Sequence, residues 1–396
     1  MRITFLGDIM VQQEQYDAYR AGNAYDFDTP LRSIRSSFAD SDYIVANLET
    51  PVAGADAGYT SEPYSFNTPA EILYALTNAG VDMAQTANNH CLDRGVSGLD
   101  RTVENIRKAG LAYLGTRDKP EDAFRIVTLG NIRVGFLAAT YGTNAFINGV
   151  YLKADEAYKV DLLQEQELSG RLERVLYSRF LPARILRRGL RTLAPGLFAV
   201  PVHERREPSR RRTARLRDNI RKCREAGAEF IFVCLHIGGQ YNPAPTQYTR
   251  ETCEFCVDCG ADAVIANHEH VAHPFYWGAQ RKAFCAYSLG NFLSATGVLS
   301  GPWDQYANYS AVYHANLRRV SGAVRASYQF ELFCSRQDER GRVVAEPAFQ
   351  VWQNSRTEAE RTRIRADCET LLRRIYRTDK APFPMRPLYD ARSESG

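Results

Sequence analysis

The sequence predicts an α/β protein built from layers of short buried strands and amphipathic helices. Three features carry this prediction: short apolar runs, stretches with helical periodicity between them, and glycines where those stretches stop. The chain has 396 residues and 44% hydrophobic content, so it can bury one large core or two ordinary ones. Alternation of strand and helix patterns along the chain favours sheets covered by helices.

The first half of the chain supplies the clearest elements. Strands are predicted at residues 3–6, 43–46 and 81–86, and a hairpin at 124–129 and 133–139 that turns at Gly130-Asn131. Helices are predicted after Thr29-Pro30 with Thr29 as N-cap, from the capping box Thr68-Pro69-Ala70-Glu71 to about Gly80, and over 96–109.

An Arg-rich insertion at about 155–210 interrupts this rhythm. Residues 171–217 contain fourteen Arg and three Glu, a net charge of +11 in a chain whose total is +4. It can be a solvated lid, a surface for an anionic polymer or phospholipid head groups, or, over 177–200, an amphipathic helix on a membrane. No nucleic-acid reader motif accompanies it, so no nucleic-acid partner is expected.

The second half returns to layers and then becomes β-rich. We expect a helix that ends at about 226, a strand at 230–235, a helix at 246–259, a strand at 262–266 and a hairpin around 278–282. Strands at 309–317, 326–333 and 343–351 and a helix at 358–376 follow. Cys253, Cys256 and Cys259 lie on one predicted helix, where packing is favoured over a cluster.

Ligand-type side chains recur just past the ends of apolar strands. In open α/β sheets, ligands bind outside the carboxyl ends of the strands. Imidazole and carboxylate together suit Mn, Fe, Ni or Zn, and a shared carboxylate can hold two ions. The pattern therefore predicts a site for one or two divalent metal ions. The side chains are Asp8; Asn47 and Glu49; Asn88, Asn89 and His90; His236; and His268 and His270.

These side chains lie in the first five of six blocks, and the sixth contains Asn291. The blocks are Gly7-Asp8-Ile9-Met10, Ala46-Asn47-Leu48-Glu49, Ala87-Asn88-Asn89-His90-Cys91-Leu92-Asp93, Leu235-His236-Ile237-Gly238, His268-Glu269-His270-Val271 and Tyr287-Ser288-Leu289-Gly290-Asn291-Phe292. In this order, over residues 1–295, they resemble the motifs of the CapA-like capsule and poly-γ-glutamate synthesis family (PGA_cap domain). That family is similar to the calcineurin-like metallophosphoesterases.

The resemblance implies a four-layer α/β/β/α metallophosphoesterase-like sandwich with two mixed β-sheets. The β-rich part at 296–378 is expected to complete the second sheet and to end in the last helix, and 379–396 is expected to be a loose tail.

The resemblance also implies roles for the polar residues. Asp8 and His270 would bind a first ion, Asn89, His236 and His268 a second, and Glu49 both. His90 would be the catalytic proton donor, and Asn47, Asn88 and Asn291 would bind substrate or orient ligands.

Three departures from the usual motifs affect this assignment. Met10 stands where the superfamily has a histidine ligand, Glu49 stands where a bridging Asp is usual, and Glu269 stands where family members have Pro. A site with a single metal ion therefore stays open.

The expected function is metal-dependent hydrolysis of a phosphoester or a γ-glutamyl polymer by metal-activated water, with an anionic polymer or phosphoester as partner. The alternative is a non-catalytic polymer-binding accessory protein of capsule or polyglutamate synthesis or export. The chain starts without an apolar leader and contains no run of ~20 apolar residues, so a cytoplasmic location is expected, with peripheral membrane contact through the insertion as an open alternative.

Overall fold

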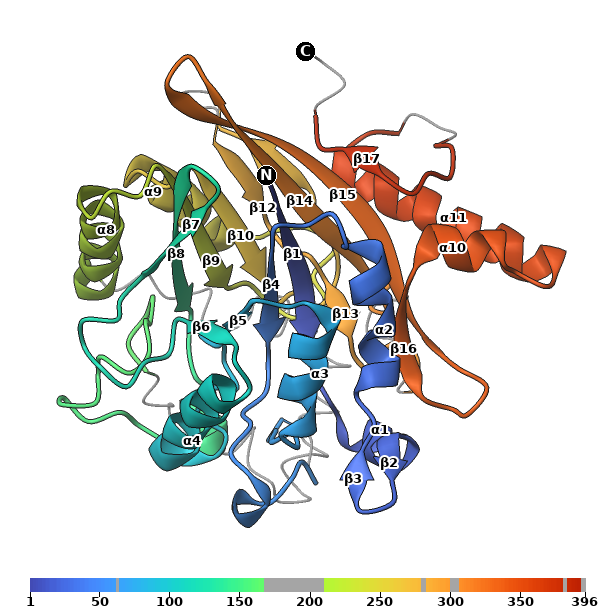
Figure 1. Ribbon diagram of the computed structural model, residues 1–396, viewed down its shortest axis with the longest axis horizontal. Helices are drawn as coiled ribbons and strands as arrows, with labels where there is room; N and C mark the ends of the chain where they lie inside the picture. The colour runs from blue at the N-terminus through green and yellow to red at the C-terminus, as the bar shows by residue number, and fades with distance from the viewer. Residues whose placement is uncertain (62–63, 167–209, 279–282, 300–305, 380–382, 393–396) are drawn as a thin grey trace, which may run out of the picture.

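The computed structural model describes residues 1–61, 64–166, 210–278, 283–299, 306–379 and 383–392 (Figure 1). Most of the Arg-rich insertion predicted at about 155–210, including its amphipathic segment at 177–200, lies outside the described residues. Among the helices that are described, none is long and apolar enough to cross a membrane.

Two mixed β-sheets form the centre of the structure (Figure 1). The larger one contains nine strands among the described residues, in the order β16-β15-β14-β1-β4-β5-β6, with β13 paired to β1 and β17 to β15. Strand β1 is parallel to β4 and antiparallel to β14. The bounds are β1 (Arg2–Ile9), β4 (Tyr43–Leu48), β5 (Met83–Gln85), β6 (Ala112–Leu114), β13 (Asn291–Leu293), β14 (Tyr309–Val320), β15 (Ala323–Gln337), β16 (Val343–Pro347) and β17 (Tyr389–Asp390).

The smaller sheet has the order β11-β12-β10-β9-β8-β7. Its four central strands are parallel, and each edge strand is antiparallel to its neighbour. The bounds are β7 (Arg125–Leu129), β8 (Ile132–Thr140), β9 (Phe230–His236), β10 (Ala263–Asn267), β11 (Phe275–Trp277) and β12 (Phe284–Ala286). A separate ribbon joins β2 (Arg20–Ala21) to β3 (Ala24–Tyr25).

Helices cover the outer faces of both sheets. Helices α1 to α4 pack on the larger sheet, α8 and α9 pack on the smaller one, and α10 lies against β15 and β16 (Figure 1). The bounds are α1 (Gln13–Tyr19), α2 (Asp28–Ser37), η1 (Ala55–Ala57), α3 (Glu71–Ala79), α4 (Gly95–Lys108), α5 (Ala145–Asn148), α8 (Arg210–Glu225), α9 (Gln247–Asp258), α10 (Ala348–Gln353) and α11 (Glu358–Tyr376).

Strand β9 shows how the sequence produces these layers. Successive strand side chains point to opposite faces, so an all-apolar strand can serve two cores. Phe232 lies in the cluster between the two sheets, whereas Val233 lies in the cluster under α8 and α9. A third cluster, under α1 to α4, covers the other face of the larger sheet. The predicted α/β class with two mixed sheets is confirmed. Cys253 and Cys256 are buried packing residues of α9.

The predicted N-caps of α2 and α3 are wrong. Helix α3 begins at Glu71 after Ala70, and no side chain caps it. Thr68 instead shares a hydrogen bond of 2.9 Å with the Thr50 hydroxyl. Helix α2 begins one residue before Thr29, whose hydroxyl donates to Asp26. In both cases a polar group nearby in space competes for the hydroxyl that would cap the helix.

The C-terminal part differs from the prediction in three ways. Strand β16 stops at Pro347, because proline lacks an N–H group and suits a helix start, and α10 follows where strand was expected up to 351. Strands β14 to β16 extend the sheet of β1 rather than the sheet of β7 to β12. The predicted loose tail contains β17, and Trp277 Nε1 donates to the Ala391 carbonyl at 2.9 Å.

Candidate metal centre

The predicted ligand side chains meet where the carboxyl ends of strands from both sheets come together. Strands β1, β4 and β5 bring Asp8, Glu49 and the loop with Asn89 and His90. Strands β9 and β10 bring the remaining three histidines. All of these side chains are buried: Asp8, Glu49, Asn89, His90, His236, His268 and His270.

A close backbone approach places Asp8. A Cβ atom at Gly7 would overlap the carbonyl oxygen of Gly290, and the Asp8 N–H donates to that oxygen at 2.9 Å. Only glycine allows β1 to lie this close to the segment that carries Asn291. The Gly-Asp pair at the end of the first strand therefore has a structural reason.

The turn after β10 holds two histidines in unusual backbone conformations. His268 has φ +106° and His270 has φ +60°, a region that L-residues other than glycine and asparagine rarely adopt. Such residues cost about 1–3 kcal/mol each and gather at functional sites. This backbone brings the two imidazole rings to 5.6 Å from one another, measured between centroids.

Glu49 lies at the middle of the cluster. Its Oε1 atom is 3.3 Å from His236 Nε2, 3.9 Å from His270 Nε2, and 4.0 Å from both His90 Nε2 and His268 Nδ1. Neither Glu49 oxygen accepts a hydrogen bond of normal geometry from the described residues. A buried carboxylate in this condition is costly unless a cation compensates it, so the arrangement fits a metal ion.

Among the described residues, two sets of three side chains have donor atoms close enough to hold an ion. One contains Glu49, His268 and His270, and the other contains Asp8, Glu49 and His236; within each set the donor atoms lie within 4.8 Å of one another. Glu49 belongs to both, as a carboxylate shared by two ions would. Nitrogen and carboxylate donors suit Mn, Fe or Zn. Which histidine serves which ion stays a prediction.

Two amides orient these ligands. Asn47 Nδ2 donates to Asp8 Oδ1 at 2.6 Å and lies 3.3 Å from His236 Nδ1. Asn291 Oδ1 lies 3.0 Å from His270 Nδ1, which also lies 3.0 Å from Asp8 Oδ2. Partners of this kind select the ring tautomer and the direction of a ligand.

The other two asparagines differ from each other. Asn89 Oδ1 lies 2.7 Å from His236 Nε2, so the two donor atoms face the same point. Asn88 instead shapes its loop, because its Nδ2 donates to the Leu48 carbonyl at 2.8 Å and its Oδ1 accepts from the His90 N–H. The Asn88 side chain therefore fixes the backbone of the loop that carries His90, and it is not part of the cluster.

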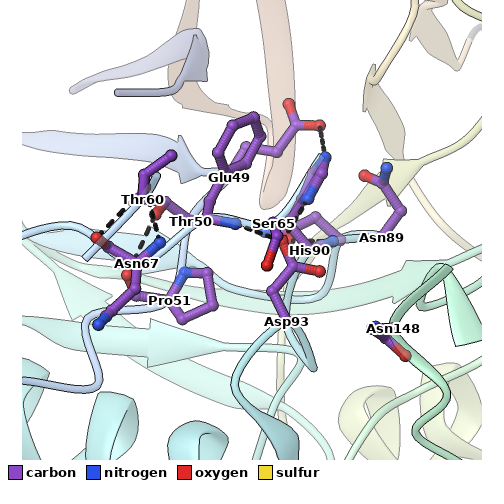
Figure 2. A network of polar contacts seen from close by, with 12 residues as sticks. Glu49, Thr50, Pro51, Thr60, Ser65, Asn67, Asn89, His90, Asp93 and Asn148 are labelled. Atoms are coloured by element: carbon purple, nitrogen blue, oxygen red, sulfur yellow. Dashed lines mark hydrogen bonds and ion pairs between the residues drawn. The ribbon is translucent and has the colours of Figure 1, made fainter. Parts of the chain in front are cut away.

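Asp93 is a site residue that sequence reasoning missed. Its Oδ2 atom lies 2.7 Å from His90 Nδ1 and accepts from the Phe66 N–H at 2.8 Å (Figure 2). The Phe66 ring lies 4.3 Å from the His90 ring, measured between centroids. Together these contacts direct His90 Nε2 toward Glu49. The spacing of three residues from His90 within one block was the available signal.

Glu269, which departs from the family pattern, contacts the turn after β9. Its Oε1 atom accepts from the Gly239 N–H at 3.1 Å. Gly238 has φ +117°, and a Cβ atom there would overlap the Glu269 carboxylate. Glu269 therefore ties the turn after β10 to the turn after β9.

The charges of the cluster are strongly interdependent. Burial, and then the charge of Glu49, raises the pKa of Asp8. Burial alone would raise the pKa of Glu49, but the charges of His236 and His270 hold it well below its usual value. Burial lowers the pKa of His270, but Glu49 and Asp8 outweigh this effect and raise that pKa to about 9. Burial keeps the pKa of His268 well below the ordinary value.

Comparison with known sequences decides the family. The model of the bacterial capsule synthesis protein PGA_cap matches residues 2–296. The chain belongs to the PGA_cap family. One relative is the capsule biosynthesis protein CapA of Bacillus anthracis, which is 24% identical over 303 residues, or 75% of this chain and 60% of that protein. Another is the PGA biosynthesis protein CapA of Bacillus subtilis strain 168, 22% identical over 296 residues, or 74% and 63%.

The match thus spans less than two thirds of the length of these PGA_cap relatives. Among solved structures, the calcineurin-like phosphoesterase YfkN of Bacillus subtilis has a TM-score of 0.39 and 14% identity, over 94% of this chain and 97% of that chain. The sulfate thiohydrolase SoxB of Thermus thermophilus has a TM-score of 0.39 and 14% identity, over 87% and 46%. Likeness this distant supports no conclusion about activity.

Proposed function

We propose that this protein is a metal-dependent hydrolase that acts on phosphoester or γ-glutamyl polymer bonds. The observation that carries the proposal is the buried Glu49 carboxylate, which lies within 4.0 Å of four imidazoles and accepts no hydrogen bond of normal geometry from the described residues. One or two divalent ions bound here would polarise the substrate and lower the pKa of a water molecule. The ligands would be Asp8, Glu49, Asn89, His236, His268 and His270.

The chain's own side chains supply orientation and a proton. Asn47 holds Asp8, and Asn291 faces His270, so both ligands are positioned before substrate arrives. The Asp93 carboxylate lies 2.7 Å from His90 Nδ1 and orients the ring, so that Nε2 points into the cluster. His90 can therefore protonate the leaving group, a contribution of roughly 10²–10⁴-fold in rate.

Two observations support the proposed substrate class. Divalent ions held by this cluster would favour a substrate that brings anionic oxygens to them. The PGA_cap relatives are named for capsule and PGA biosynthesis. An anionic polymer or a phosphoester is accordingly the proposed substrate of this chain.

The test combines metal content with turnover. Protein purified without chelator should hold near-stoichiometric Mn, Fe or Zn by elemental analysis, and an Asp8→Ala/His236→Ala variant should hold none. His314→Gln is the control, since His314 contacts Thr4 and Glu331 instead of the cluster. The intact protein should hydrolyse a phosphodiester or a γ-glutamyl oligomer, and His90→Ala should keep its metal but lose turnover.

Two outcomes would contradict the proposal. Absence of metal after reconstitution would mean that the cluster is not a metal site. Full metal content without turnover on either substrate class would instead favour a non-catalytic accessory protein that binds polymer.

A further inference from the structure

A cavity lined by arginines shares the loop after β9 with the candidate metal centre. Its volume is about 450 Å³, and its charged lining consists of Arg250, Arg373, Arg374, Arg377 and Asp379. The lining thus contains four arginines and one aspartate. Arg250, Arg373 and Arg377 are exposed, so a dissolved anion can reach them. A concave surface with one predominant sign of charge concentrates ions of the opposite sign.

One loop separates this arginine cavity from the metal centre. The Tyr241 ring lies 5.4 Å from the His270 ring, and the Tyr241 N–H donates to the Glu269 carbonyl at 2.8 Å. Two residues further along, Pro243 and its neighbours line the cavity. Residues 241–245 therefore connect the cluster to the cavity wall.

The arginine cavity joins two parts of the chain. Arg250 belongs to α9, inside the residues that the family model matches, and its Nη1 donates to the Pro245 carbonyl at 2.7 Å. The other three arginines lie at the end of α11, beyond that match. Arg373 also contacts Glu369 at 2.7 Å. The cavity is thus a feature of how the C-terminal helix packs in this chain.

The positive charge acts on a neighbouring buried group. His273 lies in the segment between the metal centre and Pro274 of the cavity wall, and its Nε2 is 2.8 Å from the Asn242 carbonyl. Burial, together with the charges of Arg374 and Arg377, lowers the pKa of His273 to about 4. The positive charges of Arg374 and Arg377 therefore affect a buried histidine that contacts the loop shared with the metal centre.

Arg377 occupies a strained backbone position. Its φ is +54°, and its N–H donates to the Arg374 carbonyl at 3.3 Å while Thr378 donates to the Arg373 carbonyl at 3.1 Å. This pattern is a Schellman motif, in which glycine is the preferred residue at the left-handed position. An arginine there costs conformational energy that a purely structural cap would avoid.

We propose that the arginine cavity binds carboxylate or phosphate groups of an anionic polymer whose cleaved bond lies at the metal centre. This inference rests on the proposed function. Guanidinium groups bind either oxyanion through two parallel hydrogen bonds, so the shared chemistry is a planar or tetrahedral oxyanion carried on a repeating chain.

The test measures anion binding without metal. In the full-length Asp8→Ala/His236→Ala background, after chelation, calorimetry at low salt follows two probes: inorganic pyrophosphate and a γ-linked glutamyl decapeptide. The variant is Arg250→Gln/Arg377→Gly. Its binding should weaken at least tenfold, since charge-assisted hydrogen bonds of this kind are worth about tenfold or more each.

Two controls keep the result interpretable. Arg377→Gly replaces a strained residue by the one that the motif prefers, so this change alone should keep or raise the melting temperature. Arg250→Gln removes the hydrogen bond to the Pro245 carbonyl, so the melting temperature of the double variant is measured beside its binding to exclude misfolding. Arg361→Gln/Arg365→Gln removes two exposed charges from the same helix, outside the cavity lining, and should leave binding unchanged.

The outcomes separate this inference from the proposed function. Arginine-dependent binding of either probe supports the cavity, and the tighter probe identifies carboxylate or phosphate as the source. No binding, or equal binding by the Arg250→Gln/Arg377→Gly variant, overturns it even if the metal-containing protein hydrolyses small substrates. Binding without any turnover in the wild type would refute the proposed function and leave the cavity standing.

Discussion

Glu49→Gln is the most direct test of the metal centre, because it keeps the shape of the side chain and removes the carboxylate shared by both ligand sets. An ion present at about a thousand times its Kd stabilises the native state by about 4 kcal/mol. Unfolding entropy of about 2.1 cal/mol/K per residue amounts to about 0.8 kcal/mol/K for 396 residues. Wild-type protein should therefore gain about 5 °C in melting temperature when Mn²⁺ or Zn²⁺ is added after chelation.

In Glu49→Gln that gain should shrink to about 1 °C or less, because both ion positions lose a ligand. Differential scanning fluorimetry with and without metal measures the shift, and elemental analysis of the same samples measures occupancy. Glu104→Gln is the matched control, since it removes an exposed carboxylate of α4 that pairs with Lys108. Equal metal-induced shifts in wild type and Glu49→Gln would show that the metal binds elsewhere, and the reasoning about the cluster would fail.

Three further predictions concern neighbouring groups. Asp93→Asn should keep the metal but lower kcat by about tenfold or more, because His90 loses the carboxylate that orients its ring; an unchanged kcat in a hydrolysis assay would exclude that role. The pKa of His270, raised to about 9, means that metal binding at pH 7 displaces a proton, so the apparent affinity should rise by up to about tenfold per pH unit between 7 and 9. Calorimetry in buffers of different ionisation enthalpy would count that proton, and a pH-independent affinity would contradict it. Asp161→Asn should lower the free energy of unfolding by about 3–5 kcal/mol, because it leaves the buried guanidinium of Arg117 without its carboxylate partner. The melting temperature should fall by about 4–6 °C. An unchanged melting temperature would mean that the pair does not contribute to stability.

The sequence predicts that these ligand-type side chains share one sheet edge because the relevant signal is local. An apolar strand carries a ligand-type residue at or just past its carboxyl end, and parallel strands share one edge. Asp8 and His236 lie in the last two residues of their strands, and Glu49 directly follows its strand. The fold class follows from the same alternation. None of these inferences needs a contact between distant segments.

Several features that were not predicted involve partners that lie far apart in the chain. Thr68 was expected to cap α3, but its hydroxyl meets Thr50. The tail was expected to be loose, but Tyr389 pairs with β15 and is buried. The arginine cavity likewise depends on α9 and α11 lying together, which periodicity does not predict.

The position of the metal centre has a consequence for stability. The larger sheet supplies Asp8 and Glu49, and the smaller sheet supplies His236 and the two histidines after β10. Between the sheets, elsewhere, apolar side chains such as Phe5 and Phe232 make the contact, with ring centroids 4.9 Å apart. At this edge the sheets face one another through charged and polar groups, whose burial opposes folding unless a cation joins them. Metal ions should therefore stabilise the packing of the two sheets as well as supply chemistry, so the chelated protein should loosen first at this edge.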